Sequence, residues 1–124
     1  MMLVRTYVFR STIHGVGLFA AEAIAKGTEV WRYHPQFDIV VPKHYAAMLP
    51  AATQEFLAMY AYPSELVGGN LLLDADNGRF MNHSPEPNTV NTGWVSYAER
   101  DIAADEEITC DYGEFYEGTF HLTP

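Results

Sequence analysis

The sequence has one cysteine, Cys110, among 124 residues. A single cysteine can form neither an internal disulfide nor a cysteine-based zinc site, and we expect it in a reducing compartment. No apolar run approaches the ~18–20 residues that span a bilayer, and none has the form of a signal peptide. These absences predict a soluble, intracellular protein, cytoplasmic or in the nucleus or nucleoid, without membrane contact and without a metal.

Basic residues are also scarce. Seven Lys and Arg residues against sixteen Asp and Glu residues give a net charge of −9. This charge repels nucleic-acid phosphates and steers basic partners toward the surface, so it predicts no direct nucleic-acid binding. The segment from residue 99 to residue 117 contains eight acidic residues and a single basic residue, Arg100. They are Glu99, Asp101, Asp105, Glu106, Glu107, Asp111, Glu114 and Glu117. A solvated acidic face that aids solubility explains them as well as a binding surface does.

The residue pattern predicts one β-rich α+β domain over residues 1–124. Seven or eight short strands are expected, among them residues 4–9, 28–33, 37–41, 71–73, 94–98 and 107–111. One helix is predicted over residues 50–61, where Phe56, Met59 and Tyr60 recur at i, i+3 and i+4. We expect this aromatic and methionine stripe to pack in the core.

The segment from Gly15 to Ala20 satisfies a dinucleotide-binding pattern. Two glycines, Gly15 and Gly17, follow a strand and precede a helix-like stretch, and Asp38 lies about 20 residues on. Such a domain needs a crossover helix between parallel strands, but residues 28–41 read as strand upon strand. A tight turn that uses the backbone freedom of glycine is the simpler interpretation.

Polar side chains cluster in Asn82-His83-Ser84 and Pro87-Asn88, next to apolar Phe80-Met81. Such a cluster must be satisfied internally or by a ligand. It could be a buried turn that holds the fold together, or a hydrolytic site in which His83 acts with Ser84 or Cys110. The serine version is disfavoured, because adjacent side chains on extended chain point apart.

The last informative segment runs from Glu107 to Asp111-Tyr112-Gly113, where a strand ends on a tyrosine. Alone, such a tyrosine is usually a half-buried packing residue. Together with the Asn82 segment and the glycine pair, however, the order and spacing from His14 to Tyr116 resemble SET-domain protein-lysine methyltransferases. The short length and the missing cysteine-rich tail are similar to the minimal viral and bacterial members.

The resemblance implies a fold of several small twisted sheets. In it, the Asn82 segment passes beneath the Tyr112 loop as a C-terminal pseudoknot. A helical insert would occupy about residues 44–63, and a lid about residues 113–124. The resemblance also implies transfer of a methyl group from S-adenosylmethionine, leaving S-adenosylhomocysteine, to a lysine of a basic protein or peptide such as a histone-like tail.

The same resemblance implies roles for individual residues. The catalytic residue would be Tyr112. The cofactor would contact Gly15, Gly17, Arg79, Asn82, His83, Tyr112 and Tyr116. The substrate tunnel would contain Tyr33, Cys110 and Tyr112.

Methyl transfer to an amine requires alignment and a neutral lysine. A sulfonium ~4 Å from the ammonium repels it by ~4 kcal/mol at an effective dielectric of ~20, which lowers the lysine pKa by ~3 units. A dedicated carboxylate base is then not needed, and Tyr112 is expected to orient the reactants.

The chain departs from the family pattern at several positions. Pro85 stands where many relatives have cysteine, so Phe115, Tyr116 and Phe120 would close the site without metal, or a homodimer partner would help. Tyr33 lacks the glycine that usually follows two residues later. Cys110 replaces a larger aromatic, which predicts products beyond monomethyl-lysine unless another aromatic fills the gap. An alternative function is a SET-like module that binds basic peptides without turnover.

Overall fold

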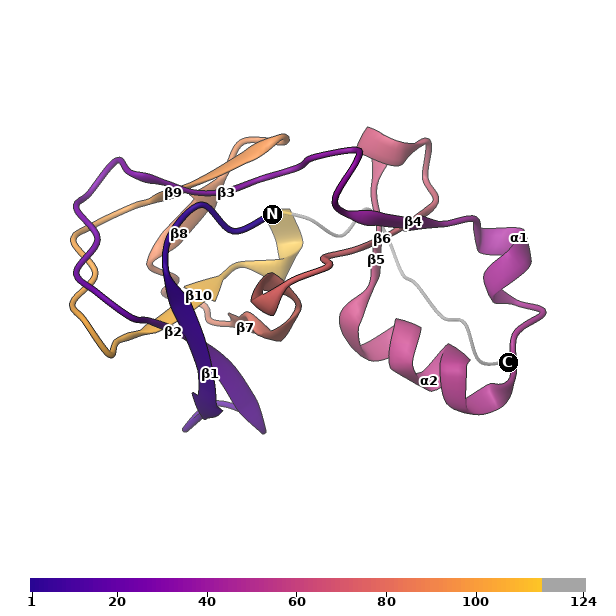
Figure 1. Ribbon diagram of the computed structural model, residues 1–124, viewed down its shortest axis with the longest axis horizontal. Coiled ribbons are helices and arrows are strands. Elements are labelled where there is room, and N and C mark those ends of the chain that lie inside the picture. The colour runs from indigo at the N-terminus through magenta and orange to yellow at the C-terminus, as the bar shows by residue number, and fades with distance from the viewer. Residues whose placement is uncertain (115–124) are drawn as a thin grey trace.

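The computed structural model describes residues 1–114, and the remaining ten residues are outside it. The chain forms three small sheets with few helices, which confirms the β-rich α+β class. Figure 1 shows the strands near both signature segments gathered on one side and the helices with the third sheet on the other. No helix within residues 1–114 is long and apolar enough to cross a membrane.

The first sheet brings the two signature segments together. Its strands are ordered β1 (Thr6–Arg10), β2 (Val16–Ala20), β10 (Glu107–Cys110) and β7 (Asn82–His83). β1 and β2 form an antiparallel hairpin, and β10 pairs antiparallel with β2. β7 runs parallel to β10, with Asn82 opposite Thr109 and His83 opposite Cys110. The Asn82 segment and the strand that leads to Tyr112 are therefore direct neighbours.

The other two sheets support this arrangement. One contains β3 (Glu29–Arg32), β9 (Val95–Ala98) and β8 (Thr89–Asn91), in that order. The other contains β4 (Ile39–Val41), β6 (Leu71–Leu73) and β5 (Tyr62–Pro63). The helices are α1 (Lys43–Ala46) and α2 (Ala51–Tyr60), and the short 3₁₀ turns are η1 (Glu65–Val67), η2 (Asn77–Phe80) and η3 (Tyr112–Glu114).

Strand β6 joins two hydrophobic clusters. Leu72 packs in the larger cluster with Leu18, Val30 and Ile108, all of which are fully buried. Leu71 and Leu73 face the smaller cluster, which includes Leu57 of α2. Alternate side chains of a strand point to opposite faces, so three consecutive leucines can serve two cores. This strand fixes the helical side of the molecule against the signature sheet.

Two sequence expectations are wrong in this region. The stretch after the glycine pair is not helical: residues 16–20 form strand β2, and residues 21–28 form turns. Gly15, with φ of +48°, lies in the turn of the β1–β2 hairpin, so the dinucleotide-binding interpretation fails. The stripe on α2 is not core either, because Met59 is 61% exposed and Leu57 is the buried residue of the helix.

Candidate active site

Three hydrogen bonds hold the Tyr112 turn on the Asn82 segment. The Ser84 amide donates to the carbonyl of Cys110 at 2.9 Å, and the Tyr112 amide donates to Nδ1 of His83 at 3.0 Å. The Tyr112 hydroxyl donates to the carbonyl of Met81 at 3.0 Å. The Tyr112 ring also lies beside the His83 ring, with centroids 5.3 Å apart. The tyrosine is thus fixed at both its backbone and its hydroxyl.

The Asn82 amide ties the same segment to the glycine hairpin. Its Nδ2 lies within 3.0–3.2 Å of the Glu107 carboxylate, the Ser11 hydroxyl, and the carbonyls of His14 and Val16. Because an amide nitrogen carries two protons, these acceptors share them. The buried Asn82 side chain therefore sets the position of the His14–Val16 backbone.

Gly17 lies against this polar cluster. A Cβ atom at position 17 would overlap the Glu107 carboxyl group and press on the Asn82 amide. The Glu107 carboxylate in turn accepts a hydrogen bond of 2.8 Å from the Ser11 hydroxyl. Glycine at position 17 is needed here for close approach, whereas Gly15 provides the left-handed backbone of the turn.

A cavity of about 500 Å³ opens beside the hairpin, α2 and the Asn82 segment. Its volume is typical of pockets that hold a small-molecule ligand. The residues that line it are Ile13, His14, Gly15, Val16, Met59, Tyr60, Arg79, Phe80, Met81, Asn82, His83 and Tyr112. Main-chain groups, apolar side chains and the cationic Arg79 therefore converge on one cavity.

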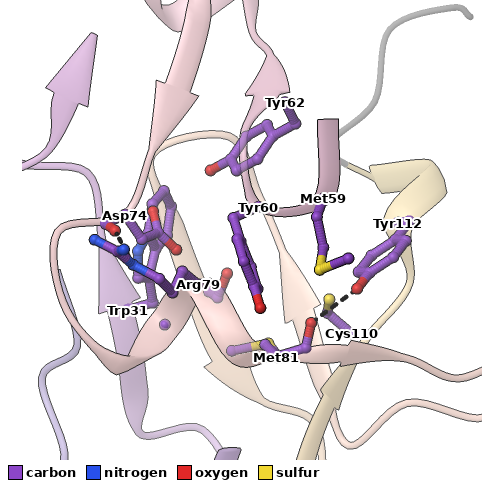
Figure 2. A pocket seen from close by; sticks show the side chains of 11 residues that line it. Trp31, Met59, Tyr60, Tyr62, Asp74, Arg79, Met81, Cys110 and Tyr112 are labelled. Carbon is purple, nitrogen blue, oxygen red and sulfur yellow. Dashed lines mark hydrogen bonds between the residues drawn. The ribbon is translucent and has the colours of Figure 1, made fainter. Parts of the chain in front are cut away.

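A second, smaller pocket of about 50 Å³ also has Tyr112 in its wall (Figure 2). Aromatic and sulfur-containing side chains dominate its wall, and among residues 1–114 one carboxyl group, that of Asp74, belongs to the wall. The two pockets share five wall residues: Met59, Tyr60, Arg79, Met81 and Tyr112. The larger cavity and the smaller pocket are therefore adjacent, and Tyr112 and Met81 belong to the wall of both.

A third pocket of about 90 Å³ adjoins the second pocket and has two acidic residues in its wall. It shares Trp31 and Tyr62 with the second pocket, and its wall includes Glu65 and Glu114. The three cavities therefore form a sequence from the third pocket, past two aromatic side chains, to Tyr112 and the large cavity.

Burial controls the ionisation of two groups in the small pocket. Burial raises the pKa of the Cys110 thiol far above its usual range, and the nearby carboxylates of Glu114, Asp74 and Asp111 add to this effect. Cys110 is therefore a poor nucleophile, which argues against the cysteine version of a hydrolytic site. Burial also raises the pKa of Asp74 from 3.8 to about 7.

The structure brings most of the predicted site residues together. Gly15, Arg79, Asn82, His83 and Tyr112 line the large cavity, and Gly17 lies next to Asn82 behind it. Cys110 and Tyr112 line the small pocket. Tyr116 lies outside the described residues, as does most of the predicted lid.

Tyr33 is placed elsewhere, because β3 ends at Arg32 and the ring of Tyr33 stacks on Trp94 at 5.3 Å. It lines none of the three pockets. Sequence reasoning missed Trp31, Tyr62 and Asp74, which do line the small pocket. The acidic residue directly after the apolar run Leu71–Leu73 was the available signal for Asp74.

Residues 1–114 contain no group of three or more His, Cys, Asp or Glu side chains arranged to hold a metal ion. The polar side chains of the site include two histidines, an asparagine, an arginine and a buried aspartate. They surround a cavity of a size typical of small-molecule sites and an adjacent aromatic pocket.

Comparison with known proteins identifies the class. The family model of the SET domain matches residues 15–113. A Plasmodium falciparum protein, provisionally named histone-lysine N-methyltransferase 1, is 34% identical over 125 residues, which cover 87% of this chain. The chain spans only 2% of the length of that relative. The chain belongs to the SET-domain family.

Solved structures agree on the fold. The crystal structure of a Plasmodium falciparum protein, also provisionally named a histone methyltransferase, superposes with a TM-score of 0.64 at 24% identity, covering 90% of this chain and 96% of the other. The second structure is Chaetomium thermophilum Polycomb repressive complex 2 in an autoinhibited conformation, bound to S-adenosylmethionine. One of its chains superposes with a TM-score of 0.66 at 22% identity, covering 93% of this chain and 16% of the other. At these identities the likeness concerns the fold.

Proposed function

We propose that the protein transfers a methyl group from S-adenosylmethionine to the side-chain amine of a lysine in a basic protein. The observation that carries this proposal is the pair of pockets that meet at Tyr112 and Met81. Methyl transfer is an in-line displacement, so the donor and the acceptor must approach one point from opposite sides. Membership of the SET-domain family and the named relative agree with this reaction.

The large cavity fits the cofactor in size and in chemistry. The backbone of Gly15 and the segment Asn82–His83 would bind its polar groups, and the apolar side chains around them would cover its ring system. When bound, S-adenosylmethionine supplies a methyl group on a cationic sulfur, whose charge also lowers the pKa of an adjacent lysine. Asn82 and Glu107 keep the hairpin in the shape that this cavity requires.

The small pocket suits a lysine side chain. Trp31, Tyr60 and Tyr62 offer apolar surfaces for its methylene groups, and they exclude water from the amine. Tyr112, held by its hydrogen bond to Met81, keeps the place where the two pockets meet at a fixed width. Its role is orientation, because a phenol with a pKa near 10 is a poor base at neutral pH.

The substrate class follows from charge. A chain with a net charge of −9 attracts basic segments, and Glu65 and Glu114 lie in the wall of the third pocket. We therefore include a basic protein such as a histone-like tail in the proposal, and with it a nuclear or nucleoid site of action. Activity on such a peptide should fall several-fold between 50 mM and 500 mM salt, because screening weakens this attraction.

The decisive experiment measures methyl transfer directly. The protein is incubated with S-adenosylmethionine carrying a labelled methyl group and with core histones or lysine-containing basic peptides. Mass spectrometry then locates the methyl groups. Incorporation on lysine supports the proposal, and incorporation on another residue type contradicts it.

A SET-like module without turnover is the second candidate. Calorimetry that detects S-adenosylhomocysteine and basic-peptide binding, with no label transferred to any of these substrates, would favour it. NAD serves as the negative control ligand. Sedimentation of the same sample shows whether a second copy of the chain helps to complete the site.

A further inference from the structure

Asp74 is a buried carboxyl group that the proposed function does not yet use. It follows strand β6, is 8% exposed, and lines the small pocket with Trp31 and Cys110. Figure 2 shows Asp74 and Trp31 on one side of this pocket and Cys110 and Tyr112 on the other. The pocket proposed for the lysine thus has a carboxyl group facing the site of methyl transfer.

The hydrogen bonding of this carboxyl group is incomplete. Its Oδ1 atom is fully buried and accepts no hydrogen bond of normal geometry from residues 1–114, although the Trp31 indole interacts with the carboxyl group. A buried acceptor without a full partner costs roughly 1–3 kcal/mol. An ammonium group in the pocket would still be attracted to the carboxyl group through space, because a charge in this buried surrounding is poorly screened.

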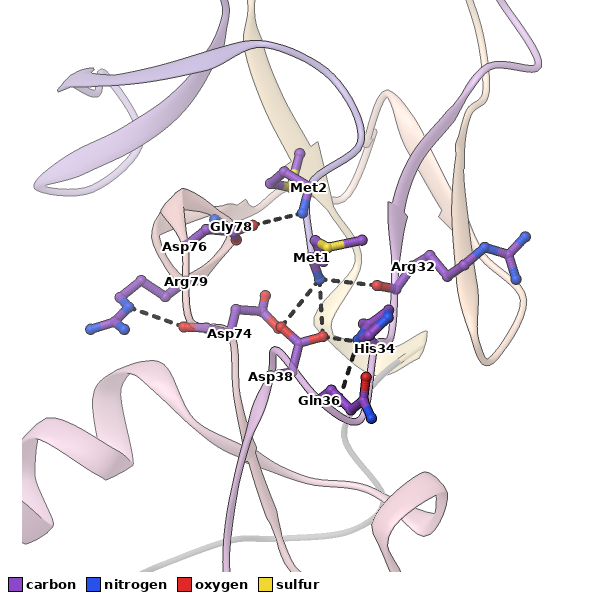
Figure 3. A network of polar contacts seen from close by, with 10 residues as sticks. All are labelled: Met1, Met2, Arg32, His34, Gln36, Asp38, Asp74, Asp76, Gly78 and Arg79. Carbon is purple, nitrogen blue, oxygen red and sulfur yellow. Dashed lines mark hydrogen bonds and ion pairs between the residues drawn. The ribbon is translucent and has the colours of Figure 1, made fainter.

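Two cations near Asp74, the Met1 amine and Arg79, form their hydrogen bonds with groups other than the Asp74 carboxylate. Figure 3 shows the neighbouring network: the Met1 amine lies 3.0 Å from Asp38, and Arg79 donates to the carbonyl of Asp74 at 3.2 Å, not to its carboxylate. Asp38 and Asp76 raise the pKa of Asp74, whereas the Met1 amine lowers it. The Cys110 thiol of the pocket wall is neutral at pH 7, because burial raises its pKa far above its usual range.

We infer that Asp74 receives the ammonium group of the substrate lysine and takes its proton before the amine reaches Tyr112. The inference rests on the proposed function. An N–H bond of the ammonium would break and an O–H bond would form on Asp74. The freed lone pair of the amine would then form a bond to the methyl carbon as the bond from that carbon to the cofactor sulfur breaks, which leaves S-adenosylhomocysteine. The methylated amine is again a cation, and Asp74 returns its proton to solvent when the product leaves. A carboxyl group with a pKa of about 7 is suited to this exchange at neutral pH.

This role makes a distinct prediction for the pH profile of kcat/KM. If free lysine, with a pKa near 10.4, reacts as the ammonium with ionised Asp74, the profile rises to about pH 7 and is then flat to about pH 10. In Asp74→Asn the rate at pH 8 should fall at least tenfold, and it should keep rising toward pH 10. Asp76→Asn is the matched control, because Asp76 accepts hydrogen bonds from the Met2 and Gly78 amides outside the pocket. It should keep the flat region and reach it at lower pH, because the Asp76 carboxylate raises the pKa of Asp74.

A second measurement on the wild-type chain does not depend on turnover or on the folding of a variant. The carboxyl carbon of Asp74 is titrated by NMR with n-butylamine, which has the side-chain length of lysine, or with n-butanol. The amine should lower the pKa of Asp74 by at least one unit, and the alcohol should not.

The outcomes separate the two proposals. Equal pKa values with both probes, or a flat profile of undiminished height in a folded Asp74→Asn protein, would overturn the role of Asp74 and leave methyl transfer intact. An inactive wild type that still shows the amine-specific shift would overturn methyl transfer and leave ammonium binding by Asp74.

Discussion

The hydroxyl of Tyr112 donates a hydrogen bond of 3.0 Å to the main-chain carbonyl of Met81, at the junction of the two pockets. This bond joins the two signature segments at the point where the proposed donor and acceptor meet. It uses the hydroxyl proton, which agrees with the orienting role proposed for the phenol. The rigidity of that junction is the property on which the proposed chemistry depends.

Removing this hydroxyl should affect turnover more than binding. Tyr112→Phe loses the bond to Met81 but keeps the ring beside His83. We expect kcat to fall at least tenfold, which corresponds to about 1.4 kcal/mol of transition-state free energy. The affinity for S-adenosylhomocysteine, measured by calorimetry, should change less than threefold. Near-normal turnover would remove Tyr112 from its catalytic assignment.

Gly17 tests the cofactor side of the site. In Gly17→Ala the new methyl group would collide with the Glu107 carboxyl group, which holds Asn82 and Ser11. We expect S-adenosylhomocysteine affinity to fall at least tenfold. Gly27→Ala is the control, because Gly27 has φ of +86° but open space around it, so alanine there costs stability without changing affinity. Equal affinity in all three proteins would contradict the proposed role of the hairpin.

Substitutions at Cys110 test what limits the number of methyl groups placed on each lysine. The buried side chain of Cys110 lines the small pocket beside Tyr112, and a larger ring there would occupy space that an added methyl group needs. Cys110→Tyr should therefore place fewer methyl groups on each lysine than wild type, whereas Cys110→Ser should keep the wild-type distribution. Mass spectrometry of one peptide at matched turnover measures both. An unchanged distribution in a folded, active Cys110→Tyr protein argues that Trp31 and Tyr62 set the limit.

Asp74 should also make stability depend on pH. Burial raises its pKa from 3.8 to about 7, so the folded chain binds an additional proton between these values. The free energy of unfolding therefore falls as pH rises through this range, by up to about 1.4 kcal/mol per unit. Asp74→Asn removes this term, so its stability relative to wild type should increase from pH 4.5 to pH 7.5. Urea denaturation measures the difference, and a constant offset would show that Asp74 does not titrate in this range.

Local patterns in the sequence were sufficient for much of the fold. The strand at residues 71–73, the helix near residues 50–61 and the strand before Tyr112 appear close to their expected positions. Each depends on the residues within it, through alternation, helix propensity and proline stops. The signature segments were likewise visible because their order and spacing are properties of the chain itself.

The shortest strands and the shortest helix were not predicted, because local patterns need more residues than these elements contain. Strands β5 and β7 are two residues long and helix α1 is four residues long, and no periodicity can be read from so few positions. β7 exists only because β10 lies beside it, so its ladder is a tertiary contact. Tyr33 shows the opposite difference, since the residue pattern extends the strand to it but β3 ends at Arg32, and the Tyr33 amide makes one further hydrogen bond, to the carbonyl of Trp94.

The sequence by itself determined the family, the class of fold and the residues of the two signature segments, because these are encoded in neighbouring positions. Only the tertiary structure decided which side chains line the small pocket. Trp31, Tyr62 and Asp74 come from three separate strands or their ends, and they meet there because the sheets pack on shared cores. The same packing takes Asp74 out of water, and desolvation, which no local pattern reveals, is what raises its pKa to about 7.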